Sequence, residues 1–255
     1  MFTYNLDPVI FHIGPLGIRW YSLFYALGFI ITYWFLKYAR KQNAHKFSDT
    51  DLSDFIVYLI VGVVIGARLF ETLIWYPSVY LKHPLEILYI WKGGLSFHGG
   101  LVGAIFATWL FCRKKSFPLV KMLDLLAIPG TFALALGRIG NFFNAEIVGT
   151  VTDVPWCVKF PRYEGCRHPS QIYGAIGRCI TGIFLMLLWK KKQLKDGTLT
   201  AFFLFFIGLG RIVADFWRED TTYLGFSTGQ WLSAIMVIVA IGIWVKQRQS
   251  ITSNT

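Results

Sequence analysis

Apolar residues fill seven stretches of the chain, and short runs of polar or charged positions separate each stretch from the next. A helix needs about 20 mostly apolar residues to cross the hydrocarbon core of a bilayer. The stretches that approach or reach this length are residues 18–36, 54–75, 95–111, 122–143, 170–189, 198–216 and 229–245. The pattern therefore predicts an all-α membrane protein with about seven transmembrane helices. The third and seventh stretches are short, so six or eight spans remain alternatives.

The composition supports this fold class. Of the 255 residues, 55% are hydrophobic, 18% are aromatic and only 15% are charged, whereas a soluble domain has about 25% charged residues. No segment of 20 to 50 residues is repeated, and no low-complexity linker divides the chain. We therefore expect a single integral membrane domain over residues 1–255.

The basic residues predict the orientation. The formal net charge of +11 could suit a nucleic acid, but fourteen of the 25 Lys and Arg residues follow the first, third, fifth and seventh stretches. Basic loops next to apolar spans suit anionic lipid head groups, so we expect membrane lipids and no nucleic acid as partners. The positive-inside rule then places these loops and the C-terminus in the cytoplasm and the N-terminus in the periplasm. The N-terminal residues contain no basic region or small-residue cleavage site, so we expect no removable signal peptide. The fourteen residues are Lys37, Arg40, Lys41, Lys46, Arg113, Lys114, Lys115, Lys121, Lys190, Lys191, Lys192, Lys195, Lys246 and Arg248.

Most of the unusual polar residues lie near the outer ends of these predicted spans. The segments concerned are residues 19–21, 93–100, 138–146, 167–173 and 211–218, together with Gln230. The exceptions are Arg68, Glu71, Asp124 and Arg178. The orientation was derived from loop charge alone, so this convergence is an independent observation. It predicts a functional site at the outer face of the membrane, because polar groups there cost several kcal/mol unless they are paired or hydrated.

The densest of these segments is residues 137–149. It combines the guanidinium of Arg138, the amides of Asn141 and Asn144 and the carboxylate of Glu146 with three glycines, which allow close approach of a helix or a ligand. A site is the favoured interpretation. The alternative is a packed helix end in which Arg138 and Glu146 pair with each other.

The residue types favour a phosphate ligand. Guanidinium groups match phosphate oxygens with two parallel hydrogen bonds, and the abundant phosphate at the outer leaflet is a phospholipid head group. His98, flanked by Gly99 and Gly100, could accept a proton near neutral pH. No Cys/His cluster has metal-ligand spacing, so we expect neither a metal nor a cofactor. The residues alone leave group transfer, lipid or anion transport, simple lipid binding and a structural scaffold as alternatives.

Residues 137–149 resemble the signature of the prolipoprotein diacylglyceryl transferases, GRxGNFxNxExxG, and match it at every fixed position. Four further blocks resemble this family and follow in the family's order. They lie at residues 7–21, 96–101 and 168–171 and at Gly229-Gln230.

The resemblance implies a bacterial inner-membrane enzyme whose active site faces the periplasm. Such an enzyme moves the diacylglyceryl group of phosphatidylglycerol to the cysteine thiol in the lipobox of a prolipoprotein, and glycerol 1-phosphate leaves. This is the first step of lipoprotein maturation, and it uses no cofactor.

The resemblance also implies roles for individual residues. Arg138 would bind the head group, Arg211 would lie near the reaction and His98 would take the thiol proton. Residues expected to bind substrate or hold the arginines are Tyr21, Asn141, Asn144, Glu146 and Gly149. The expected supporting residues are His168, Gln171 and Asp215.

The chain departs from the family's pattern at two positions. Gly174 stands where the family often has Glu, which weakens any role for an acid at that site. Asp215 stands where Glu is common, four residues after Arg211, and could still pair with it along one helix face. We expect a short periplasmic segment at residues 144–168 instead of an elaborate outer domain.

Three pairings remain open from the sequence. Cys157 and Cys166 form either a disulfide or two free thiols in this outer segment. Arg68 either pairs with Glu71 or contributes with it to a second polar layer behind the head group. Arg178 faces either a buried acid, such as Asp215, or a lipid-filled cavity.

Overall fold

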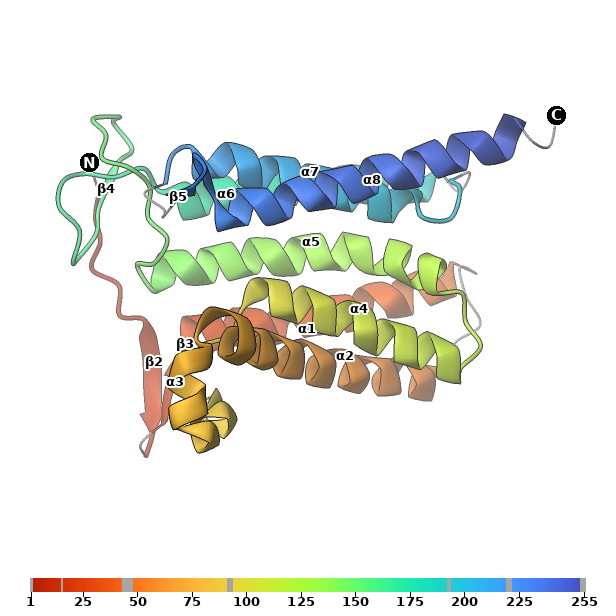
Figure 1. Cartoon of the computed structure of the whole chain (residues 1–255), viewed down its shortest axis with the longest axis horizontal. Helices are drawn as coiled ribbons and strands as arrows, with labels where there is room; N and C mark the ends of the chain where they lie inside the picture. Colours follow the sequence, from red (N-terminus) through yellow and green to blue (C-terminus); the bar gives the residue numbers. More distant parts are fainter. Residues whose placement is uncertain are drawn as a thin grey trace. The chain divides into compact units, whose positions relative to one another are not determined.

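The computed structural model describes residues 2–14, 16–42, 48–90, 94–191, 194–218 and 222–252. Lys46, Gly93 and Lys192, to which predictions above refer, lie outside these ranges. Helices make up most of the described chain (Figure 1). Within it, six helical segments are long and apolar enough to cross a membrane, which confirms a helical, multi-pass membrane protein. They are Trp20–Lys41 (α1), Asp49–Trp75, Leu119–Phe143 (α5), Ser170–Lys190 (α6), Thr198–Asp215 (α7) and Thr228–Gln249. The second consists of α2 (Asp49–Phe70) and the π-helical turn η1 (Glu71–Trp75) that continues it, and the last lies within α8 (Thr228–Thr252).

The third predicted span corresponds to α4, Phe97–Lys114. This helix has 18 residues but is not among the six, because His98, Arg113 and Lys114 lower its hydropathy. Seven spans therefore stay a prediction. The second span begins earlier than predicted, at Asp49, because Ser48 and Asp51 form a capping box that starts the helix before the apolar run.

The chain forms two compact units, and residues 33–123 make up one of them. In this unit α2 packs along α4, and the contact is made by glycines four residues apart, Gly62 and Gly66 on α2 and Gly99 and Gly103 on α4. A methyl group on Gly66 would overlap the carbonyl oxygen of Gly99. Small residues at this spacing let two membrane helices approach closely. The short helices α3 (Pro77–Lys82) and η2 (Pro84–Leu88) belong to the same unit.

The other unit consists of residues 1–32 and 124–255. Here α6, α7 and α8 lie side by side, with α7 packed against both of the others (Figure 1). A methyl group on Gly208 of α7 would come within 2.9 Å of the Ser233 carbonyl oxygen of α8, so these two helices are also in close contact at a glycine.

Short strands in the loops complete the fold, and the hydropathy pattern did not predict them. β1 (Phe2–Thr3) pairs in parallel with β4 (Val158–Lys159), while β2 (Val9–Ile13) with β3 (Leu16–Arg19) and β5 (Thr222–Tyr223) with β6 (Phe226–Ser227) form antiparallel pairs.

A small core holds the segment between α5 and α6. Tyr4, Val148, Val158 and Phe160 are buried against one another there. A disulfide joins Cys157 to Cys166, so the first of the two alternatives for these cysteines is confirmed.

Candidate active site

The polar side chains at the end of α5 do not all pair with one another. Glu146, exposed in the turn beyond the helix, accepts hydrogen bonds from the side-chain amides of Asn141 (Nδ2 to Oε2, 3.4 Å) and Asn144 (Nδ2 to Oε1, 3.2 Å). Arg138 is half-buried and makes no hydrogen bond or ion pair with any residue that the structure describes. The alternative of a packed helix end with an Arg138–Glu146 pair is therefore wrong.

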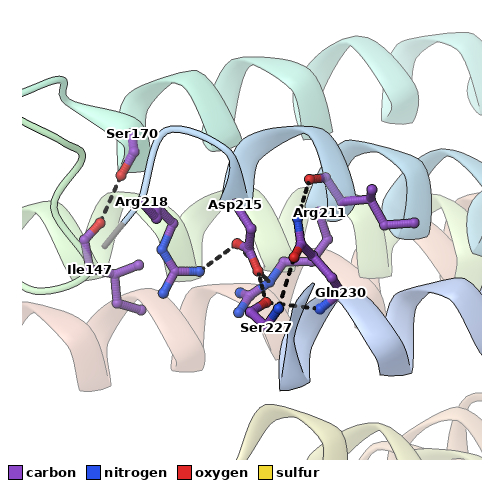
Figure 2. A network of polar contacts seen from close by, with 8 residues as sticks. Ile147, Ser170, Arg211, Asp215, Arg218, Ser227 and Gln230 are labelled. Atoms are coloured by element: carbon purple, nitrogen blue, oxygen red, sulfur yellow. Dashed lines mark hydrogen bonds and ion pairs between the residues drawn. The ribbon is translucent and has the colours of Figure 1, made fainter. Parts of the chain in front are cut away.

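The turn that follows α5 has an unusual backbone. Ala145 and Ile147 both have positive φ angles, 52° and 57°, which are costly for residues with a Cβ and persist only where surrounding contacts fix them. Two side chains at the start of α6 provide these contacts. Ser170 Oγ donates to the Ile147 carbonyl (2.7 Å, Figure 2), and Gln171 Nε2 donates to the Glu146 carbonyl (2.7 Å). Gln171 thus supports the site through the backbone.

Gly149 lies where three segments meet. Its N–H donates to the carbonyl of His168 (3.0 Å), its carbonyl accepts from Arg167 Nη1 (3.1 Å), and it forms an isolated β-bridge with Arg218. A methyl group at this position would lie 2.6 Å from both Cβ and the carbonyl oxygen of His168. The geometry gives Gly149 a packing function, because only glycine fits between these segments.

The carboxylate of Asp215 links two arginines and a serine. It accepts hydrogen bonds from Arg211 Nε (3.2 Å to Oδ2), Arg218 Nη1 (2.7 Å to Oδ1) and Ser227 Oγ (2.8 Å to Oδ2), as Figure 2 shows. The Asp215 side chain is 1% exposed, whereas that of Arg211 is 22% exposed. The predicted Arg211–Asp215 pair is confirmed, and it holds Arg211 while leaving part of its side chain accessible.

Ser227, the serine that binds Asp215, lies directly before α8. Ser227 and Gln230 form a reciprocal cap, in which the Gln230 N–H donates to Ser227 Oγ (3.0 Å) and the Ser227 N–H donates to Gln230 Oε1 (2.8 Å). Gln230 Nε2 also donates to the carbonyl of Ile212 on α7 (3.2 Å). These bonds hold the Ser227 hydroxyl, which donates a hydrogen bond to Asp215. Residues of α7 and of the start of α8 therefore position the carboxylate together.

Several positive charges gather beside Arg138. Arg178, Arg211 and Arg218 lie close enough for their charges to act unfavourably on it, and the carboxylate of Asp215 acts in the opposite sense. In a medium of low dielectric constant such like charges repel strongly unless an anion lies among them. The arrangement can therefore bind a negatively charged group.

Tyr21, at the start of α1, also lies near this group. Its phenol interacts electrostatically with Arg138 and Glu146 and shares a hydrogen bond with Tyr25 (O···O 3.1 Å). A methyl group on Gly140 of α5 would come within 2.8 Å of the Tyr21 ring, so the close packing of α1 on α5 places this ring.

His168 lies in a chain of polar contacts over the loop before α6. Its Nδ1 is 3.2 Å from the hydroxyl of Tyr173, which also accepts a hydrogen bond from Trp156 Nε1 (2.6 Å). These contacts connect His168 to the first turn of α6 and to Trp156 in the preceding loop. A pocket of about 260 Å³ is lined by Ile147, Val148, Tyr163, Arg167 and Arg218.

Comparisons with known proteins show the family of the chain. Residues 8–246 match the model of a family described as prolipoprotein diacylglyceryl transferase. The chain belongs to this family. Three relatives carry the name phosphatidylglycerol–prolipoprotein diacylglyceryl transferase. The protein of Cupriavidus pinatubonensis is 40% identical over 96% of this chain and 94% of its own length. That of Bordetella parapertussis is 42% identical over 94% and 95%, and that of Neisseria meningitidis serogroup C is 39% identical over 93% and 94%.

Ten of the eleven residues assigned by resemblance to the diacylglyceryl transferases lie in the unit formed by residues 1–32 and 124–255. The exception is His98, which lies in the other unit, in the first turn of α4. It is half-buried, and its ring centroid is 6.5 Å from that of Phe70. The function of His98 stays a prediction.

Two residues of this polar cluster have no function in the sequence analysis. Ser227 was not named, although the spacing Ser-x-x-Gln with Gln230 is typical of a capping box and predicts the helix start. Arg218 was noted at the end of a span but was given no function. It forms an ion pair with Asp215, the last residue of α7, from the loop three positions further on, and this short spacing is the signal in the sequence for the pair.

Proposed function

We propose that the chain transfers the diacylglyceryl group of phosphatidylglycerol to the cysteine thiol of a prolipoprotein lipobox. The observation that carries the proposal is Arg138, a half-buried guanidinium that has no acceptor among the described residues and lies beside Arg178 and Arg211. A phosphate ester supplies the missing negative charge. Family membership and the names of relatives with about 40% identity support the same reaction.

The reaction needs fixed positive charge at the leaving group. The sulfur attacks the glycerol carbon that carries the phosphate, a carbon–sulfur bond forms, and the carbon–oxygen bond breaks. The electron pair of that bond goes to the phosphate oxygen, and glycerol 1-phosphate leaves. Arg138 would bind the phosphate, and Arg211, held by Asp215, would stabilise the charge that develops on its oxygens. Fixed donors of this kind need no reorganisation during the reaction.

The thiol must lose its proton before or during the attack, because the thiolate is the nucleophile. We assign this proton to His98, whose imidazole is suited to general base catalysis near neutral pH. In His98→Gln we expect loss of the base and therefore loss of the rise in rate as pH increases through the range where histidine deprotonates. A pH–rate profile measures this. A variant with full activity and an unchanged profile would remove His98 from the mechanism.

The remaining assignments concern the membrane. We place residues 1–255 in one domain of the bacterial inner membrane, with α4 as a seventh span, the N-terminus and the active site facing the periplasm and the C-terminus in the cytoplasm. Residues 144–168 would form a short periplasmic segment. Basic residues in the last turns of α1, α4 and α6 support this orientation. The Cys157–Cys166 disulfide suits an oxidising compartment. A cysteine at exposed Val151 should react with an impermeant maleimide in spheroplasts, and one at Arg113 should react only after lysis.

A transfer assay tests the function directly. The purified chain is placed in vesicles that contain phosphatidylglycerol and is given a peptide with a lipobox cysteine. We expect the peptide to gain a diacylglyceryl group by mass spectrometry, with release of glycerol 1-phosphate. A peptide with serine in place of the cysteine and vesicles of phosphatidylcholine are the controls. Absence of the lipidated peptide when phosphatidylglycerol and the cysteine peptide are both present would refute the proposal.

A further inference from the structure

Arg178 is a second arginine with too few acceptors. It lies nine residues into α6, and its Nη1 donates to the carbonyl of Gly174 one turn earlier (2.8 Å). Its Nε is buried and has no hydrogen-bond partner among the described residues. A guanidinium has five N–H donors, and a buried cation without partners is strongly unfavourable. Arg178 is therefore poorly satisfied by the protein alone.

Gly174 brings Arg178 and Arg138 together. A methyl group at position 174 would lie 2.9 Å from Nη1 of Arg178 and 3.6 Å from both Cγ and Cδ of Arg138. Two arginine side chains, one from α5 and one from α6, thus lie against the same glycine. A larger residue at this position would displace the Arg178 guanidinium, so the absence of a side chain at Gly174 permits this arrangement.

The nearby carboxylate is already used by other side chains. Asp215 receives hydrogen bonds from Arg211, Arg218 and Ser227. Its charge acts on Arg178 and Arg138, but neither of these two arginines donates to it within the described chain. The sequence left open whether Arg178 faces a buried acid or a lipid-filled cavity, and both alternatives stay predictions. Arg178 interacts electrostatically with Asp215, but N–H donors of its guanidinium stay available for another group.

We propose that Arg178 binds the phosphate ester of the lipid substrate together with Arg138, as a further head-group-binding residue. The proposal rests on the proposed function and assigns a third arginine to that site. Phosphatidylglycerol is a phosphodiester with one negative charge, whereas the released glycerol 1-phosphate is a monoester with a charge of about −1.5 to −2 at pH 7. Two adjacent guanidinium groups match the second charge, so Arg178 should contribute more to binding of the released monoester than to binding of the diester.

Kinetics with both ligands test this inference. In Arg178→Gln we expect the KM for phosphatidylglycerol to rise about tenfold and the inhibition constant of glycerol 1-phosphate to rise by roughly 10- to 100-fold, the range for one hydrogen bond between charged groups. The kcat should change less than either value. Arg178→Lys should fall between the wild type and Arg178→Gln, because it keeps the charge but loses the planar fork. Glycerol, which has no phosphate, should not inhibit any variant.

The matched control is Lys190→Gln, which removes one charge from the exposed end of the same helix and should leave the KM and the inhibition constant unchanged. Gly174→Ala should raise both constants, because its methyl group competes with the guanidinium. If Arg178→Gln does not fold, the two constants of Gly174→Ala test the same inference. Unchanged constants in a folded Arg178→Gln, or a fall in kcat alone, would overturn the inference. The proposed function would survive either result, because it fails only if the wild type transfers no diacylglyceryl group.

Discussion

Arg68 and Arg138 are both held within helices of a membrane protein, but the protein satisfies only one of them. The guanidinium of Arg68 donates to three backbone carbonyls, through Nε to Ile87 (2.9 Å), Nη1 to Gly94 (3.0 Å) and Nη2 to Glu86. It also lies over the ring of Tyr80 at 5.1 Å. Arg138 has no such acceptor in the described chain.

The comparison separates an arginine whose donors the protein satisfies from one that has no acceptor among the described residues. Arg68 is 5% exposed and connects η2 and the segment at Gly94 to the end of α2, and its charge attracts the carboxylate of Glu71. The residues named here all belong to the same unit as Arg68. No described residue supplies an acceptor to Arg138, and desolvating a cation without an acceptor is unfavourable. Unsatisfied donors, more than charge itself, therefore point to the site.

The largest expected effect is on catalysis at Arg138. We expect Arg138→Ala to lower the transfer rate by about 10² to 10³-fold, the range for loss of one donor that stabilises developing negative charge. The melting temperature should not fall, because the side chain makes no hydrogen bond to the described protein. The vesicle assay and thermal unfolding in detergent measure the two quantities. A normal transfer rate in Arg138→Ala would contradict the distinction drawn between Arg138 and Arg68.

The opposite outcome is expected at Arg68. In Arg68→Met three carbonyls lose their donor, and a buried group left unsatisfied costs about 1–3 kcal/mol. We expect the free energy of unfolding to fall by roughly 3 kcal/mol in total, while the rate per folded molecule changes by less than about threefold. Arg113→Met, at an exposed position of α4, is the control and should change neither. Loss of activity without loss of stability at Arg68 would reverse the assignment.

Arg211 is an intermediate case, since it has a protein acceptor and partial exposure. We expect Asp215→Asn to lower kcat/KM by about tenfold, because Arg211 and Arg218 lose a charged partner and are positioned less firmly. Asp215→Glu should recover part of the loss, since a carboxylate remains. An Asn variant as active as the wild type would show that Arg211 needs no such positioning.

Much of the fold was predictable from the local pattern of apolar residues. The features that were not predictable depend on helix capping or on contacts between distant segments. Helices α5, α6 and α7 agree closely with the predicted stretches because apolar runs of that length have few alternatives in a bilayer. The start of α2 was missed because a capping box, and not hydropathy, sets it. The short strands were missed because they depend on pairing between distant segments, such as Phe2 with Val158.

The candidate site was predictable as a set of residues but not as a set of contacts. Arg138, Arg211 and Asp215 were identified from sequence, and the i, i+4 spacing predicted one pair correctly. The links from Asp215 to Ser227 and from Gln171 to the Glu146 carbonyl join positions that are 12 and 25 residues apart, and no local pattern encodes them. The disulfide was equally undecided, because two cysteines in a loop fit a bridge or two thiols.

The membrane class, the family and the set of candidate polar residues were all predictable without coordinates, because these properties follow from hydropathy, charge and a motif along one chain. Only the tertiary structure decided which arginines the protein satisfies. It placed Arg178 with Arg138 against Gly174 and gave the carboxylate of Asp215 to Arg211 and Arg218. The physical reason is that a hydrogen-bond donor is satisfied by whatever acceptor the fold brings within about 3 Å, and that acceptor can come from any part of the chain.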